Sequence, residues 1–189
     1  MDRQSVIDTT HRWIESVVIG LNLCPFARRV FEGGTIRYAV SDAEDEKGLL
    51  DDLARELQLL AATPIADVET TLLIHPRAFT DFLDYNDFLD PAEQLLAQLG
   101  LEGVIQIAGF HPDYQFADTE PDAVENYTNR SPYPMLHLLR EDSVSAVAGD
   151  PDELAEIPRR NIETLKALGI AKIREMLVAI ARDDRNQDR

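Results

Sequence analysis

The sequence lacks three features that would assign it to common classes of protein. It contains a single cysteine, Cys24, so it can form neither an intramolecular disulfide nor a zinc site made only of cysteines. It has no run of about 18 apolar residues. Its first residues, MDRQSVIDTTHRW, also lack the apolar stretch of a signal peptide. We therefore expect a soluble, cytoplasmic protein without a membrane-bound segment.

Positive charge is scarce as well. The 189 residues include 18 Lys and Arg against 35 Asp and Glu, which gives a net charge of -17. Residues 41–125 hold 3 of the basic and 20 of the acidic side chains. Because affinity for nucleic acids and anionic membranes depends on cations, we predict neither as a partner. The charge distribution still allows a small anionic molecule as a ligand, because several arginines lie outside the acidic segment: Arg28, Arg29, Arg130 and Arg140.

The common signatures of cofactor and hydrolase sites are also absent. The chain has no GxxxxGKS, GxGxxG, GxSxG or HExxH motif. The acidic segment 84–90, DYNDFLD, lacks the glycine and the terminal glutamate of a calcium loop. The sequence therefore identifies no cofactor, and it leaves open both the oligomeric state and whether the protein is an enzyme.

The apolar periodicity predicts a single α/β domain over residues 1–189, with frayed ends at 1–4 and 184–189. Apolar runs that alternate with amphipathic helical segments indicate successive βαβ units with right-handed crossovers. We therefore predict a three- to four-stranded, mostly parallel sheet with helices packed on it and a helical C-terminus. The expected strands are 35–40 and the two apolar runs that end in His-Pro, 71–76 and 104–112. The expected helices include 5–19, one capped by Ser41 and Glu44, 79–89 and one from Pro91.

The second half of the chain carries a long polar loop. Residues 112–132 include three prolines, and loops of this length are uncommon and usually functional. After it we expect a short helix over 134–139 and an edge strand over 143–147. The Asp150-Pro151 pair then predicts the start of the C-terminal helices.

Two histidines follow predicted strands, each in a His-Pro pair. Parallel strands would bring His75 and His111 to the carboxyl edge of one sheet, which is where open α/β sheets bind ligands. Near His111, three polar residues could fix its tautomer or orient a substrate: Asp113, Tyr114 and Gln115. A structural histidine that bonds to the loop backbone is the alternative.

Cys24 is a candidate nucleophile or metal ligand. If a helix begins at Pro25, its amides and the nearby Arg28 and Arg29 would lower the pKa of the thiol. The alternative is a small buried hydrophobic residue, which is the usual role of a free cysteine.

The segment 126–134, NYTNRSPYP, concentrates amides, hydroxyls and a guanidinium before the expected helix. Arg130 could hold a carboxylate or phosphate with two hydrogen bonds, and Asn126 and Asn129 could assist it. His137 follows in the predicted helix. The alternative is a rigid loop whose polar side chains satisfy its own backbone.

Several long blocks of the sequence resemble an uncharacterised bacterial family of domains of unknown function. These blocks are WIESVVIGLNLCPFA, TTLLIHP with DYNDFL, GFHPDYQFAD and ENYTNRSPYPMLHLLRE. The resemblance implies no activity, cofactor or substrate. Its blocks include these candidate residues: Cys24, His111, Asp113, Tyr114, Gln115, Asn129, Arg130 and His137.

Three hypotheses follow from the sequence. The first is a small enzyme or ligand-binding protein acting on a small anionic substrate at the carboxyl edge of the sheet. Its catalytic residues would be Cys24, His111 and Asp113, and its substrate-binding residues Arg28, Tyr114, Gln115, Asn126, Asn129, Arg130 and His137. The second is a metal-binding protein that uses Cys24, His75, His111 and His137. The third is a noncatalytic, acidic protein-interaction domain.

Overall fold

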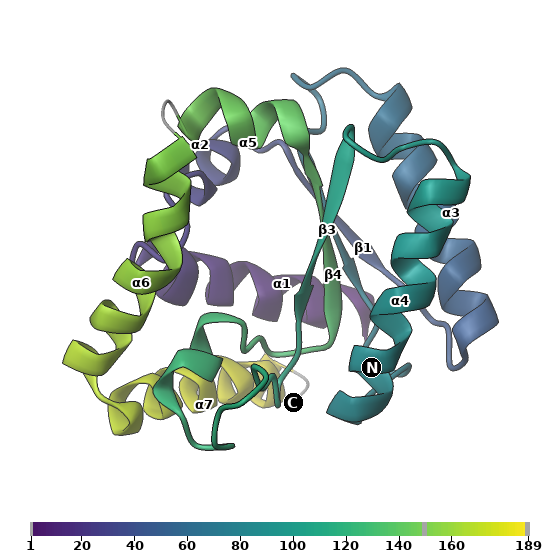
Figure 1. Cartoon of the computed structure of the whole chain (residues 1–189). Coiled ribbons are helices and arrows are strands. Elements are labelled where there is room, and N and C mark those ends of the chain that lie inside the picture. The colour runs from purple at the N-terminus through teal and green to yellow at the C-terminus, as the bar shows by residue number, and fades with distance from the viewer. Residues whose placement is uncertain (1, 149–150, 188–189) are drawn as a thin grey trace.

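One mixed sheet organises the protein. A computed structural model describes residues 2–148 and 151–187, and it holds four strands in the order β1-β2-β4-β3 (Figure 1). β1 and β2 pair in parallel, whereas β4 lies antiparallel to both β2 and β3. The expectation of a mostly parallel sheet is therefore wrong. The strands are β1 (Ile36–Val40), β2 (Thr70–Ile74), β3 (Ile105–Phe110) and β4 (Met135–Arg140).

The error comes from one segment, β4. We expected a helix over 134–139, but this segment forms a strand. Its sequence, MLHLLR, has apolar residues at spacings that suit either a helix or a strand covered on both faces. β4 lies between β2 and β3 in the sheet, and its residues contribute to the cores on both faces. β1 and β2 still form a parallel βαβ unit with α3, as predicted.

Helices surround the sheet and begin close to where the sequence places them. α1 continues into a π-helix, η1, and a 3₁₀ helix, η2, lies in the long loop. The helices are α1 (Arg3–Trp13), η1 (Ile14–Ile19), α2 (Ala27–Glu32), α3 (Glu46–Ala62), α4 (Phe82–Gln98), η2 (Val124–Thr128), α5 (Glu141–Ala148), α6 (Pro151–Leu168) and α7 (Ile170–Gln187).

Three local predictions are wrong. α3 is capped by Asp45 rather than Ser41, whose hydroxyl instead accepts from the Ala43 amide. α4 runs through Pro91 without a break, because one apolar stripe stays buried along its whole length. α5 replaces the expected edge strand over 143–147, since two acidic residues in its first turn favour a helix start. The predicted cap Asp150 and residues 188–189 lie outside the described residues.

Each face of the sheet has its own helical layer. α3 and α4 cover one face, and α1, η1, α6 and α7 lie on the other (Figure 1). β4 alternates between them: Leu136 and Leu138 belong to the α3–α4 core, and Met135 belongs to the opposite core. His137 therefore points to the same face as Met135.

Within the described ranges, no helix combines the length and the apolar character needed to cross a bilayer.

Candidate functional site

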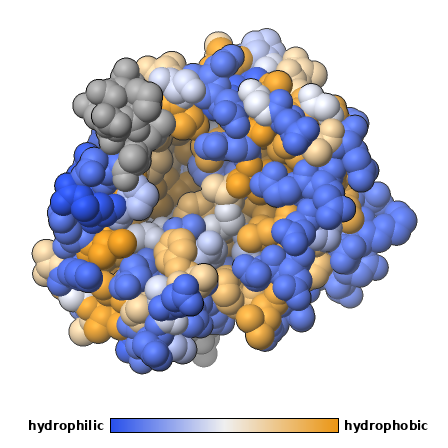
Figure 2. Space-filling view, in the orientation of Figure 1, coloured by the Kyte–Doolittle hydropathy of each residue, from blue (hydrophilic) through white to orange (hydrophobic). Residues whose placement is uncertain are grey.

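The α1 face of the sheet is hollowed by a cavity in two parts. The inner part, of about 110 Å³, lies between the sheet and the segments that include α1, η1, α2 and α5. The outer part, of about 600 Å³, lies between η1, the long loop and α6. Both parts are lined by Val18, Cys24 and Phe110, so they adjoin. Figure 2 shows a recess between α6 and the sheet, with hydrophobic residues inside it and hydrophilic residues around it.

Most side chains around the inner cavity are apolar, and several are aromatic. The apolar lining consists of Trp13, Ile14, Val18, Phe26, Ala27, Val30, Ile36, Leu72, Phe110, Leu139 and Val144. The polar lining residues gather where β2 begins and where β4 ends. They include Glu69, Thr70, His137, Arg140 and Ser143. Such a composition, apolar with a few placed polar groups, is typical of small-molecule sites.

His137 presents a free hydrogen-bond acceptor at this cavity. Its Nε2 lies 2.7 Å from the Thr70 hydroxyl, which itself donates to the Leu138 carbonyl at 2.7 Å. Since the Thr70 proton is used, Nε2 must carry the proton and donate it to Thr70. Nδ1 is then the unprotonated nitrogen, and it has no protein partner in the described part of the chain. Burial lowers the pKa of His137 to about 4, so the imidazole is neutral at pH 7.

Cys24 lies in the turn between η1 and α2 and lines both parts of the cavity. Burial raises the pKa of its thiol, and hydrogen bonds from the amides of Phe26 and Ala27 offset this only in part. α2 begins at Ala27 rather than Pro25, so Cys24 does not occupy the helix cap. The thiol is consequently protonated at neutral pH.

The arginines near Cys24 are engaged elsewhere. Arg28 is exposed and pairs with Glu32 at 3.4 Å. Arg29 forms two hydrogen bonds with Glu69, one of them 2.8 Å long, which join α2 to the start of β2. The hydrogen bonds from Arg29 also lower the pKa of the Glu69 carboxyl. This ion pair lines the cavity and neutralises the charge of Arg29 there.

Arg140 supports the same end of the cavity. One of its terminal nitrogens donates to the carbonyls of Leu60, Thr63 and Val68, around the end of α3 and the segment that follows. Its Nε is buried and has no partner among the described residues. Arg140 therefore acts mainly as a cap for the free carbonyls of α3.

His111 has a different environment from His137. Its Nδ1 accepts from the Asp113 amide at 3.0 Å, so Nε2 carries the proton and donates to the Phe79 carbonyl at 3.2 Å. The ring is buried against Phe82 and Tyr85. Burial also lowers the pKa of His111. Because the backbone satisfies both ring nitrogens, His111 fixes the start of the long loop.

His75 lies beside His111, at the edge where both were expected. Its Nδ1 donates to the Ala78 carbonyl at 2.9 Å, and its ring stacks on Tyr85 with centroids 5.8 Å apart. Burial lowers the pKa of His75 to about 4. Its Nε2 is buried without a partner in the described ranges. His75 and His111 contact Tyr85 of α4 and thus lie on the α4 side, whereas His137 faces the cavity.

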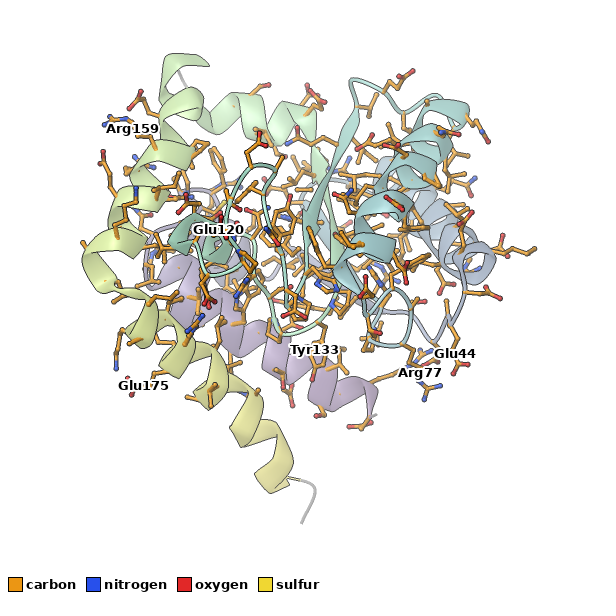
Figure 3. The ribbon with its side chains drawn as sticks, turned by 60° about the horizontal axis from the view of Figure 1, so that its bottom comes forward. Glu44, Arg77, Glu120, Tyr133, Arg159 and Glu175 are labelled. Atoms are coloured by element: carbon orange, nitrogen blue, oxygen red, sulfur yellow. The ribbon has the colours of Figure 1, made fainter. Side chains whose placement is uncertain are left out.

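The polar side chains of the long loop mostly hold the loop itself. Figure 3 shows this loop, with Glu120 labelled, between α6 and the sheet. Asn126 is buried and bonds to Phe116, Thr119 and two loop carbonyls. Arg130 donates to the carbonyls of Tyr114 and Pro121 and lies over the Tyr127 ring.

The other predicted loop residues follow the same pattern. Gln115 donates to the Thr119 carbonyl at 2.6 Å. Tyr114 packs its ring against Phe82 and Phe116, and burial raises the pKa of its hydroxyl. Asn129 donates to the Gly109 carbonyl at 3.1 Å and also lines the outer cavity. Of the predicted site residues, three therefore line the cavity: Cys24, Asn129 and His137.

The four residues of the metal hypothesis do not form one cluster. Cys24 and His137 line the cavity, while His75 and His111 lie on the α4 side of the sheet. In the part of the chain that the structure describes, no three His, Cys, Asp or Glu side chains are placed to hold a metal ion.

Among the polar cavity residues that sequence reasoning missed, two make hydrogen bonds that shape the site. Thr70, which fixes the His137 tautomer, is one of two threonines in an otherwise apolar strand. Asn161 is buried and donates to the Leu23 carbonyl at 2.7 Å, which ties α6 to the Cys24 turn. It stands four residues before Leu165 in the buried stripe of α6. A polar residue within an apolar stripe was the available signal in both cases.

Fold and cavity together define an α/β protein with a space of ligand size on one face of a mixed four-stranded sheet. The chain belongs to the family described as Protein of unknown function (DUF1415), which matches residues 5–175. No curated protein and no solved structure matches the chain.

Proposed function

We propose that this protein binds a small molecule in the cavity on the α1 face of its sheet and that His137 is the principal polar contact. The observation that carries the proposal is the unpaired Nδ1 of His137, held in one tautomer by Thr70. A polar group with no protein partner next to a cavity calls for an explanation, and a ligand or an ordered water supplies one.

The dimensions support a ligand of modest size. The outer part, at about 600 Å³, falls within the ~300–1,000 Å³ that is usual for ligand pockets. The lining is chiefly apolar, so most of the binding free energy would come from burial of apolar ligand surface. His137 and the polar groups around it would then select among ligands of similar size.

The chemistry available at the cavity is proton transfer. A neutral imidazole with a free Nδ1 can accept a proton and thus act as a general base. Cys24 lines the same space with a protonated thiol, which can donate a hydrogen bond or, once deprotonated, act as a nucleophile. Asn129 and Asn161 would border the outer part of the ligand.

The anionic substrate stays a prediction. Arg28 and Arg130, its predicted partners, are occupied by Glu32 and by loop carbonyls. Arg29 lines the cavity but is paired with Glu69. These contacts leave Arg28, Arg29 and Arg130 unavailable to a strong anion. The acidic interaction domain likewise stays a prediction.

A fragment screen by ligand-observed NMR tests the proposal. We expect several small, mainly apolar compounds to bind the wild type and to lose binding in Val18→Phe, which fills space between the two parts of the cavity. Val178→Phe is the matched control, because Val178 is exposed on α7. Compounds that bind Val18→Phe as well as Val178→Phe would place the binding site elsewhere.

A further inference from the structure

We infer that the ligand is an uncharged, ring-sized compound whose hydroxyl group donates a hydrogen bond to Nδ1 of His137, as a phenol would. The inference rests on the proposed function and specifies the chemistry of the ligand. Three features of the cavity carry it: the acceptor at His137, the volume of the inner part, and its aromatic walls.

Toward His137, the polar group of the ligand must be a donor. Nδ1 of His137 has a lone pair and no proton, and the proton of Thr70 is already given to the Leu138 carbonyl. Neither group can donate to an acceptor on the ligand. A ligand without a donor leaves Nδ1 unpaired, and a carboxylate places its negative oxygen against the Nδ1 lone pair. Both arrangements disfavour binding. The unpaired N–H groups of Trp13 and Arg140, which line the same cavity, could donate in turn to the hydroxyl oxygen of the ligand.

The inner cavity has the size of one ring. Its volume of about 110 Å³ is somewhat below the ~150 Å³ of an engineered cavity that holds benzene. A planar ring of six atoms therefore fits with small adjustments, and a bicyclic compound would extend into the outer part. The hydroxyl reaches His137 only from the inner part, because His137 does not line the outer one.

The walls are suited to an aromatic ring. Trp13 and Phe110 pack edge to face with centroids 5.5 Å apart, and Phe110 lies 6.2 Å from the His137 ring. All three line the inner cavity. Aromatic rings prefer such edge-to-face and offset contacts, so a phenol ring can continue the arrangement.

Calorimetric titration of the whole protein at pH 7 with phenol, toluene and benzoate tests the inference. Toluene replaces the hydroxyl by a methyl group of similar size, and benzoate replaces it by a charge. We expect phenol to bind about tenfold more tightly than toluene, because one buried hydrogen bond is gained, and we expect benzoate to bind most weakly. Equal affinities for phenol and toluene, or tightest binding of benzoate, would overturn the inference.

Two variants separate the hydrogen bond from other effects. In His137→Phe, which keeps a ring but removes the acceptor, toluene should bind at least as tightly as phenol. His11→Phe is the control, since His11 is exposed and lies outside the cavity. A phenol preference that persists in His137→Phe contradicts the assigned acceptor. If that variant does not fold, the comparison of the three compounds on the wild type still decides the inference.

The same titration keeps the two proposals apart. If toluene and phenol bind equally and Val18→Phe abolishes both, the cavity binds ligands and only the hydroxyl preference is wrong. The proposed function itself fails if neither compound binds and if no fragment binds the wild type but loses binding in Val18→Phe.

Discussion

The two faces of the sheet differ in how completely they are filled. On the α3–α4 face, leucines and aromatic rings with almost no exposed surface pack against the strands: Leu49, Leu53, Leu57, Leu60, Tyr85 and Phe88. On the α1 face, aromatic and aliphatic side chains surround a cavity. One face thus stabilises the fold, while the other combines a core with a space for a ligand.

His111 and His137 repeat this difference, although His75 on the α4 side also keeps one ring nitrogen free. The backbone occupies both ring nitrogens of His111 on the α4 side, whereas His137 on the cavity side keeps Nδ1 free. Their sequence contexts gave the opposite ranking, because His111 stands before a polar loop and His137 stands within an apolar run. Whether a histidine nitrogen is free to bind a ligand depends on its hydrogen-bond partners in the fold rather than on polar neighbours in the sequence.

The largest expected effect concerns the filled face. Phe88→Ala should lower the free energy of unfolding by about 3–5 kcal/mol, since it removes a fully buried ring from a close-packed core. Urea denaturation measures the loss. A loss below about 1 kcal/mol would mean that this face is not packed as described.

The second prediction concerns pH. Burial lowers the pKa of both His75 and His137 from 6.5 to about 4, so between these values the unfolded chain binds more protons than the folded protein. The free energy of unfolding should therefore fall as the pH falls through this window, by roughly 2 kcal/mol for each histidine at pH 5.

Urea denaturation of His137→Phe at pH 7 and pH 5 isolates one of the two histidines. The variant should lose less stability than the wild type over this range, by about the contribution of one histidine. His11→Phe should behave like the wild type, because His11 is exposed. The same pH dependence in His137→Phe and the wild type would show that His137 is not buried in its neutral form.

A third prediction compares the same kind of enlargement on both faces. Leu53→Phe should destabilise the protein by about 1–3 kcal/mol, because the α3–α4 core has no room for a larger side chain. Val18→Phe should change stability by less than about 1 kcal/mol, because the cavity accommodates the ring. Thermal unfolding of the two variants measures the two changes in stability. Equal losses of stability would speak against a cavity.

The smallest expected effect concerns Cys24. Because burial raises the pKa of its thiol, iodoacetamide should alkylate Cys24 more slowly than it alkylates glutathione at pH 8. Phenol should slow the reaction further if it occupies the cavity that Cys24 lines. Mass spectrometry gives both rates. Alkylation faster than that of glutathione would indicate an activated thiolate instead.

Much of the fold follows from the sequence. The strands β1, β2 and β3 and most helices coincide with apolar periodicity, and β1, α3 and β2 form the expected parallel unit. β4 could not be predicted, because the run from Met135 to Arg140 suits a helix as well as a doubly covered strand. Its placement between β2 and β3 depends on long-range pairing that no local pattern encodes.

The candidate site was predicted only in part. Cys24, Asn129 and His137 line the cavity as candidates taken from the sequence. Thr70 and Asn161 were missed because each acts through a distant partner, 67 residues away for Thr70 and 138 for Asn161. Conversely, Arg130 and Asn126 looked available, but backbone carbonyls in the loop occupy them. Local composition identifies polar residues, but it does not show which of them keep a hydrogen-bonding atom free for a ligand.

The most direct test of a binding site on the α1 face is an amide NMR titration of the assigned wild-type protein with phenol. The largest shifts should fall on residues that line the inner cavity, among them Val18, Cys24 and His137. Shifts concentrated instead at the sheet edge, around His75 and His111, would contradict a ligand site in the cavity.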